Sequence, residues 1–189
     1  MTEMNRFSRF FVNRSARRRS ARELRWLRGA VPLPEGLTCL ELGCGAGQMA
    51  LLFQEAYRPA RYVATDLDPD QLAEAQRTWQ RRFPGGVPPP LELRRADMLA
   101  LDFPAGSFDA VLAFVTIHHA SASHHDYSRI PVVLDGIDRV LRPGGFVIYA
   151  EMLHQERIRA WFAEHGYRLR AVRPKFHLEY VVVQKPPPA

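Results

Sequence analysis

Residues 38–49 read Thr-Cys-Leu-Glu-Leu-Gly-Cys-Gly-Ala-Gly-Gln-Met, and this stretch decides the fold. It opens with an apolar run of strand length that only Glu41 interrupts. Three glycines at alternate positions follow, and a helical pattern begins at Met49. A strand, a glycine turn and a helix in this order let an α/β protein bring its backbone close to a ligand, because a side chain would fill the space that glycine leaves open.

The glycine spacing differs from that of a dinucleotide-binding turn. A G-x-G-x-x-G fingerprint would place its third glycine at position 48, where the chain has Gln48, whereas the third glycine is Gly47. Glu41 stands two residues before the first glycine, at the carboxyl end of the expected strand. A carboxylate in this place can accept hydrogen bonds from a cationic ligand, so the turn suits an amino group better than a pyrophosphate.

Downstream, strand patterns alternate with helix patterns, which predicts a doubly wound parallel sheet. After the strand at 38–42 we expect strands at about 61–65, 91–95, 108–115, 146–149, 167–173 and 177–184, and helices at about 47–57, 69–82, 129–141 and 154–165. The last two strands are too close together for a crossover helix and should pair antiparallel. The predicted fold class is α/β: a Rossmann-like, mostly parallel seven-stranded sheet with the last strand antiparallel, plus an N-terminal basic helix.

Length and composition indicate one globular domain. The chain has 189 residues, of which 47% are hydrophobic and 24% charged. It shows no secretory signal pattern and no apolar run near the ~20 residues of a membrane span. The two cysteines, Cys39 and Cys44, are not expected to pair, which favours a reduced, cytoplasmic protein. We expect an N-terminal arm over residues 1–36, one domain over 37–185 and a frayed tail over 186–189.

Positive charge is concentrated in the N-terminal arm. The first thirty residues hold nine arginines and two glutamates, a charge of +7, so the remainder carries −1 of the total of +6. Residues 15–30 have a helical pattern whose shared face consists of Ser20, Leu24, Leu27 and Val31. Three interpretations stay open: a solvated helix on the domain edge, a lid docked on the carboxyl edge of the sheet, or an arm that binds an anionic partner such as RNA.

Five ordered motifs resemble those of the class I S-adenosylmethionine (SAM)-dependent methyltransferases, over about residues 37–184. They are the glycine turn after Glu41, Ala64-Thr65-Asp66, Ala96-Asp97-Met98, Phe108-Asp109-Ala110-Val111 with Ile117-His118-His119 after it, and Leu141-Arg142-Pro143-Gly144-Gly145-Phe146. The resemblance implies SAM as the cofactor and a methyl acceptor that we expect to be a small molecule. It also implies that the site residues converge at the carboxyl ends of the strands.

The same resemblance assigns roles to the strand ends. Glu41 and the glycines, with the carbonyl groups around Ala113 and Phe114, would hold the methionine portion of SAM. Asp66 would accept the ribose hydroxyls, Asp97 the adenine amino group, and the Met98 amide would reach a ring nitrogen. The full cofactor-binding set is Glu41, Gly43, Cys44, Gly45, Gly47, Asp66, Leu67, Asp97, Met98, Ala113 and Phe114.

Some of these positions have simpler interpretations. Asp97 also suits a loop or cap, and Asp68 is an alternative to Asp66 that we interpret as a helix cap. Cys44 fits the turn as a small packing residue, since no general base is recognisably matched to it.

His118 and His119 follow the fourth strand and are the candidate catalytic residues. Imidazole can take a proton from a hydroxyl or carboxyl acceptor, although transfer from a sulfonium depends mainly on in-line positioning and does not require a base. A nearby run, His124-His125-Asp126, has no structural zinc spacing, and adjacent histidines rarely point at one ion, so no metal is predicted.

Two other functions are weighed against methyl transfer. An NAD(P)-dependent oxidoreductase is disfavoured by Gln48 and by the absence of a recognisable Tyr-x-x-x-Lys pair. An RNA-binding or SAM-sensing module without catalysis would use the arginine-rich arm, and nucleic acid is not the favoured partner.

Overall fold

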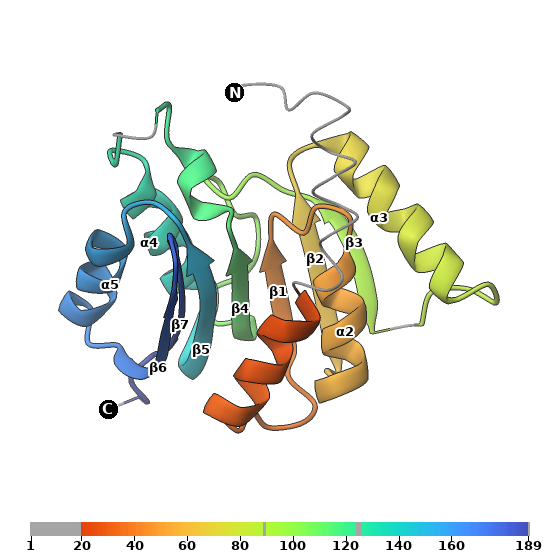
Figure 1. Ribbon diagram of the computed structural model, residues 1–189, viewed down its shortest axis with the longest axis horizontal. Helices are drawn as coiled ribbons and strands as arrows, with labels where there is room; N and C mark the ends of the chain where they lie inside the picture. Colours follow the sequence, from red (N-terminus) through yellow and green to blue (C-terminus); the bar gives the residue numbers. More distant parts are fainter. Residues whose placement is uncertain (1–19, 89, 124–125, 189) are drawn as a thin grey trace.

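A seven-stranded sheet with helices on both faces makes up the computed structural model, which describes residues 20–88, 90–123 and 126–188 (Figure 1). A helix covers residues 20–30 at the start of the described chain. The elements after it are β1 (Thr38–Leu42), α2 (Gln48–Tyr57), β2 (Arg61–Asp66), α3 (Pro69–Arg82), β3 (Leu91–Arg95), β4 (Phe108–Phe114), the 3-10 helix η1 (Ile117–Ala120), α4 (Ile130–Val140), β5 (Leu141–Glu151), α5 (Gln155–Glu164), β6 (Arg168–Lys175) and β7 (Leu178–Gln184).

The sheet order is β3-β2-β1-β4-β5-β7-β6, and β7 runs antiparallel to both of its neighbours. The predicted fold class is therefore confirmed, including the antiparallel last strand. The order reverses between β1 and β4, because the chain builds outward from β1 on one side and returns to β4 on the other. Such a switch point opens a crevice outside the carboxyl ends of the strands, where ligands bind in open α/β sheets.

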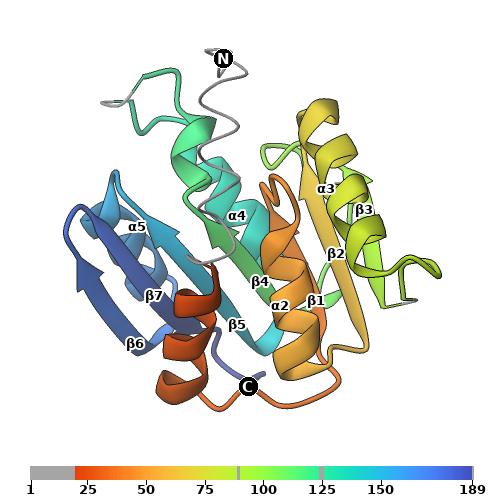
Figure 2. The ribbon, with the colours of Figure 1, turned by 45° about the vertical axis from the view of Figure 1, so that its right-hand side comes forward.

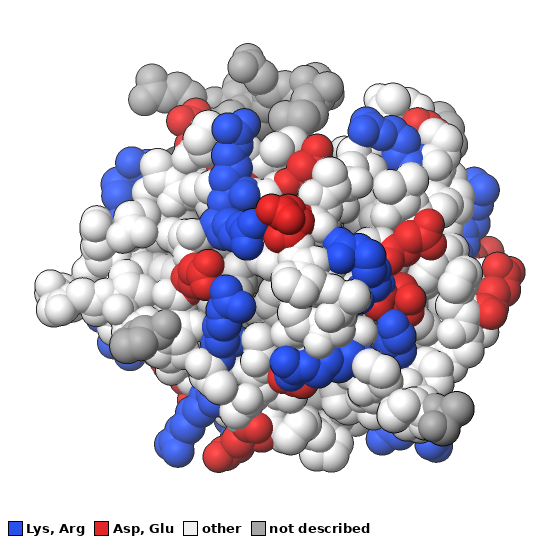
Figure 3. All heavy atoms as spheres, turned by 180° about the vertical axis from the view of Figure 1, so that it is seen from behind, with Lys and Arg blue, Asp and Glu red and all other residues white. Residues whose placement is uncertain are grey.

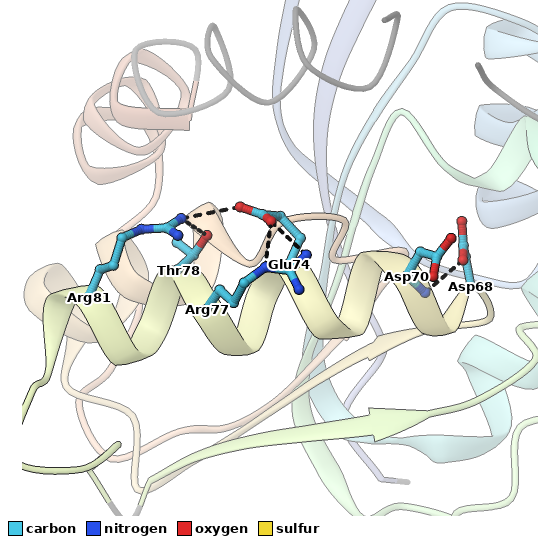
Figure 4. A network of polar contacts seen from close by, with 6 residues as sticks. All are labelled: Asp68, Asp70, Glu74, Arg77, Thr78 and Arg81. Atoms are coloured by element: carbon cyan, nitrogen blue, oxygen red, sulfur yellow. Dashed lines mark hydrogen bonds and ion pairs between the residues drawn. The ribbon is translucent and has the colours of Figure 1, made fainter. Parts of the chain in front are cut away.

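The start of α3 is set by local chemistry, as the sequence predicts. The Asp68 carboxylate accepts a hydrogen bond from the Asp70 backbone N–H at 2.9 Å, and Pro69 occupies the first turn. Further along the helix, Glu74 accepts hydrogen bonds from Arg77 and Arg81 on the exposed side (Figure 4). The cap fixes where the chain leaves β2 and so holds Asp66 at the strand end.

β5 is longer than the expected 146–149 and begins at Leu141. The pairing of β4 with β5 shifts register between Phe108 and Ala110, which lets the Pro-Gly-Gly turn remain within the strand. A Cβ at Gly145 would lie 2.8 Å from the Asp109 carbonyl oxygen, so only glycine fits this close approach. The sequence did not predict residues 141–145 as part of this strand, because glycine and proline normally indicate a loop.

Two apolar clusters cover the two faces of the sheet. One joins α4 and α5 to the sheet and includes Phe108, Ile137 and Phe162. The other joins α2, α3 and the N-terminal helix to the opposite face and includes Phe53 and Trp79. Central strands β1 and β4 are buried on both sides, as their continuous apolar runs predict.

The helix over residues 20–30 packs on the face of the sheet beside α2 (Figure 2). Its predicted apolar stripe is buried: Leu24 is 7% exposed, and Leu27 and Val31 are each 2% exposed. These side chains share a cluster with Ala110 and Val182, which lie inside β4 and β7. The expectation that this helix docks on the carboxyl edge is therefore wrong for the described residues, because the stripe covers sheet surface that α2 leaves open. Residues 1–19 lie outside the described chain.

Candidate active site

The glycine turn after β1 is held from both sides by close packing. A Cβ on Gly43, which has φ of 63°, would lie 2.0 Å from Thr116 Oγ1, just beyond the end of β4. At Gly47 a Cβ would lie 2.6 Å from Trp79 Nε1, and this indole N–H donates a hydrogen bond to the Gly47 carbonyl at 2.9 Å. The turn is thus fixed between β4 and α3, and a larger residue at either glycine would push these elements apart.

Gly45 is different, because nothing but the end of the Gln71 side chain comes within 4 Å of its Cβ position. Its backbone N–H donates to Asp66 Oδ2 at 2.9 Å, and the Asp68 N–H donates to Asp66 Oδ1 at 3.0 Å. A carboxylate offers about four acceptor positions, so Asp66 keeps others for a ligand. The open space at the turn and the partly exposed carboxylate therefore lie side by side at the ends of β1 and β2.

Glu41 is buried one strand position before this turn, with 3% of its surface exposed. The Tyr62 hydroxyl donates to Glu41 Oε2 at 3.0 Å. Burial raises the pKa of the Glu41 carboxyl to about 8; the Asp66 and Glu23 charges also raise it, and the Tyr62 hydrogen bond lowers it. A cation placed beside Glu41 would offset this burial cost, so the residue is suited to a positively charged ligand group.

Asp97 makes a local turn after β3. Its Oδ1 accepts the Leu99 backbone N–H at 2.9 Å, which is the loop role that the sequence left open. The side chain is only partly buried, as are those of Met98 and Leu67. The Leu67 carbonyl accepts a hydrogen bond from Arg95 at 3.2 Å, which joins the ends of β2 and β3.

Both cysteines are free and buried. Burial raises the pKa of the Cys44 thiol well above its usual value, and the Glu41 and Asp66 charges raise it further. A thiol in this state is a poor nucleophile. These properties match the interpretation of Cys44 as a packing residue in the turn.

His118 is paired with Glu151, an acid that the sequence analysis did not select. His118 Nδ1 lies 2.7 Å from Glu151 Oε2, and the side chains are 7% and 0% exposed. Glu151 Oε1 also accepts the backbone N–H groups of Thr116 at 2.9 Å and Ile117 at 2.6 Å. One carboxylate at the end of β5 therefore fixes both the start of η1 and the imidazole beyond it. The sequence did offer one signal for Glu151, since an acidic residue directly follows the apolar residues 146–150 of β5.

The chain bends sharply between β4 and η1. Val115 has φ of 57°, a conformation that a β-branched residue rarely adopts, and its N–H donates to the Ala150 carbonyl at 2.7 Å. This bend turns the chain away from Ala113, which is fully buried in β4, and from the partly buried Phe114. The Glu151 hydrogen bonds to Thr116 and Ile117 hold the bend in place.

His119 is exposed, and its ring centroid lies 4.1 Å from that of His118. Within residues 20–88, 90–123 and 126–188, no group of three or more His, Cys, Asp or Glu side chains is placed to hold a metal ion. His124 and His125 lie outside the described residues.

The candidate residues follow the order of the strands along one edge of the sheet. Asp97 comes after β3, Asp66 ends β2, the glycine turn follows β1, His118 follows β4 and Glu151 ends β5. The contacts of Gly45 with Asp66 and of Gly43 with Thr116 join neighbouring strand ends across the switch point. The edge thus presents an open glycine turn with carboxylates on one side and a braced imidazole on the other.

A family model described as a methyltransferase domain matches residues 40–149, from inside β1 to near the end of β5. The chain belongs to the class I SAM-dependent methyltransferases. That class implies S-adenosylmethionine as the cofactor.

Two curated relatives show how far the similarity extends. A fatty-acid O-methyltransferase of Mycolicibacterium smegmatis is 35% identical over 127 residues, which are 67% of this chain and 41% of the relative. A demethylmenaquinone methyltransferase of Thermus thermophilus is 38% identical over 136 residues, 68% of this chain and 54% of the relative. The chain therefore spans about half the length of these relatives or less.

Solved structures share the fold at low sequence identity. The PH0226 protein from Pyrococcus horikoshii superposes with a TM-score of 0.78 at 16% identity, covering 97% of this chain and all of the other. A SAM-dependent methyltransferase from Aquifex aeolicus superposes with a TM-score of 0.76 at 15% identity, covering 96% of this chain and 99% of the other.

Among the described residues, no helix is both long and apolar enough to cross a membrane.

Proposed function

We propose that the chain transfers a methyl group from SAM to a hydroxyl or carboxyl oxygen of a small organic acceptor. One observation carries the proposal: the imidazole of His118, held by Glu151 at 2.7 Å, follows β4, the strand that shares the switch point with the glycine turn. The contact between Gly43 and Thr116 ties the two parts of the site together. A proton acceptor at this place suits an acceptor oxygen that reacts best after losing its proton.

The residues fit the cofactor at three points. The free space at Gly45 lets a ligand approach the backbone of the turn closely. Asp66 has unused acceptor positions for two hydroxyl groups. Glu41 is a buried carboxyl that a cationic amino group would stabilise in its ionised form. We assign these residues to the ribose and methionine portions of SAM, with Ala113 and Phe114 beside the methionine portion.

Asp97 and Met98 follow β3, the strand next to β2, and we assign them to the adenine ring. The Asp97 oxygen that accepts from Leu99 anchors the turn, which leaves the second oxygen for an amino group.

The bound cofactor supplies an electrophilic methyl group whose carbon–sulfur electron pair stays with sulfur. The chain has to orient the acceptor and receive its proton. His118 takes the proton from an acceptor hydroxyl as the oxygen forms its bond to the methyl carbon, and the Glu151 carboxylate stabilises the resulting imidazolium. For an acceptor that is already a carboxylate, the same residues act only by positioning.

Two further observations favour a small acceptor. The relative from Mycolicibacterium smegmatis is named a fatty-acid O-methyltransferase, and this name describes methyl transfer to an oxygen atom of a fatty acid. On the face shown in Figure 3, basic and acidic side chains of the described chain are interspersed, and no broad basic field for a polyanion is present there.

The first test is cofactor binding. SAM and S-adenosylhomocysteine should raise the melting temperature in proportion to their affinities, because each binds only the folded state, whereas NAD should not. Incubation with a panel of fatty acids, phenols and alcohols should then produce S-adenosylhomocysteine, with primary amines as the matched negative set. Stabilisation by NAD alone would exclude the proposal. Binding of SAM without turnover on any acceptor class would instead favour a SAM-sensing module.

A further inference from the structure

Glu151 does more than cap the start of η1. Its two oxygens have different partners: Oε1 accepts two backbone N–H groups, and Oε2 faces His118 Nδ1. Both backbone donors are fixed, because they belong to the bend at Val115 and the first residue of η1. The carboxylate therefore cannot rotate to present a different group to the imidazole without giving up these hydrogen bonds.

This arrangement decides which nitrogen of His118 carries the proton. An ionised carboxylate can only accept, so the proton of the neutral imidazole must sit on Nδ1. Nε2 then carries the lone pair, and no hydrogen bond to Nε2 is made within the described chain. The His118 side chain keeps 7% of its surface exposed, so the imidazole is not fully enclosed by the described residues.

We propose that Glu151 is the positioning residue that holds His118 in the Nδ1–H tautomer and presents Nε2 as the proton acceptor for methyl transfer. The proposal deepens the function proposed above and rests on it only for the identity of the proton donor. The tautomer itself is a property of the ligand-free protein and can be measured without any acceptor.

Glutamine at position 151 is the informative substitution. The amide oxygen of Glu151→Gln can still accept the Thr116 and Ile117 N–H groups, so the bend and η1 should be kept. Its NH₂ group then faces His118 Nδ1 and can only donate, which forces the proton onto Nε2. A change of one atom type thus inverts the tautomer while the packing stays the same. Glu179→Gln is the matched control, since Glu179 pairs in register with Glu151 but forms an ion pair with Arg159 at 3.1 Å.

The experiment is nitrogen-15 NMR of the histidine rings in the full chain, with His118 assigned by the signals lost in His118→Asn. We expect a protonated Nδ1 and a lone pair on Nε2 in the parent and in Glu179→Gln, and the reverse in Glu151→Gln. Thermal melting checks that Glu151→Gln is folded. A parent protein with the proton on Nε2, or a Glu151→Gln protein with an unchanged tautomer, would overturn the proposal.

Turnover provides the second measurement. With an acceptor from the panel, Glu151→Gln should lower kcat about 100-fold or more, with SAM affinity changed less than about twofold, because general-base catalysis contributes roughly 10²–10⁴. A merely structural cap would lower SAM affinity and thermal stability and would spare kcat in the folded fraction. An inverted tautomer with unchanged kcat would show that this pair does not serve the transfer. Absence of turnover in the parent would refute the proposed function and leave the NMR result to decide the tautomer.

Discussion

Replacing Glu41 with glutamine should stabilise the ligand-free protein increasingly as the pH rises. The carboxyl has a usual pKa of 4.5 and a pKa of about 8 in the folded protein, chiefly because it is buried. Between these values the folded state keeps a proton that the unfolded chain loses, so the free energy of unfolding falls with rising pH. Below pH 4.5 both states are protonated and Glu41 has no such effect.

The magnitude follows from the width of this window. Each pH unit is worth about 1.4 kcal/mol, so Glu41 costs on the order of 3 kcal/mol of stability at pH 7 and about 5 kcal/mol above pH 8. Glutamine has no charge to bury and keeps an oxygen that can accept from the Tyr62 hydroxyl. The variant should therefore be as stable as the parent at about pH 4.5 and more stable than the parent by several kcal/mol at about pH 9.

Urea unfolding of both proteins across this pH range measures the difference directly. Glu92→Gln is the matched control, because Glu92 is an exposed carboxylate paired with Arg61 and its loss should change little. SAM should reverse the ranking, since its amino group favours ionised Glu41 in the parent only. A stability difference between parent and Glu41→Gln that does not change with pH would refute the reasoning.

Four other substitutions or deletions test the remaining parts of the site. Gly43→Ala should cost about 2–4 kcal/mol of folding stability in thermal or urea melts, because its methyl group meets Thr116 in a left-handed backbone. Gly45→Ala should cost only about 1 kcal/mol of stability and instead weaken SAM binding measured by calorimetry, since its methyl group enters open space. Asp66→Ala should lose about 1–3 kcal/mol of SAM binding in the same assay, and unchanged affinity would remove it from the ribose site. Deleting residues 1–14 should lower turnover and SAM retention if the arm is a lid, whereas tight, salt-sensitive RNA binding by the parent would favour the polyanion interpretation.

Local features of the fold were predictable from sequence because they depend on neighbouring residues. The glycine turn, the Asp68 cap and the apolar runs of β1 and β4 each follow from a few adjacent side chains. The antiparallel pair β6–β7 followed from the short connection between its strands. These elements were therefore placed correctly without any tertiary information.

Features that depend on distant segments were not predictable. Glu151 acts on His118 across 33 positions, and that contact requires β5 to lie beside β4 in the observed register. Likewise the apolar stripe of the N-terminal helix was visible in the sequence, but the surface it covers was not. An apolar stripe predicts that one face of a helix is buried, but it does not predict which surface that face packs against. The roles of Asp97 and of the arm therefore stay predictions for the experiments above.

The contact between Trp79 and Gly47 gives the protein a built-in optical reporter. The Trp79 indole is 1% exposed and bonded to the carbonyl of the glycine turn, so its emission should respond when that backbone shifts around a ligand. The chain has only two other tryptophans, Trp26 on the N-terminal helix and Trp161 on α5, and both lie in other elements. A Trp26→Phe, Trp161→Phe protein would leave a single fluorophore at the turn, and stopped-flow fluorescence could then follow ligand entry in real time without any label.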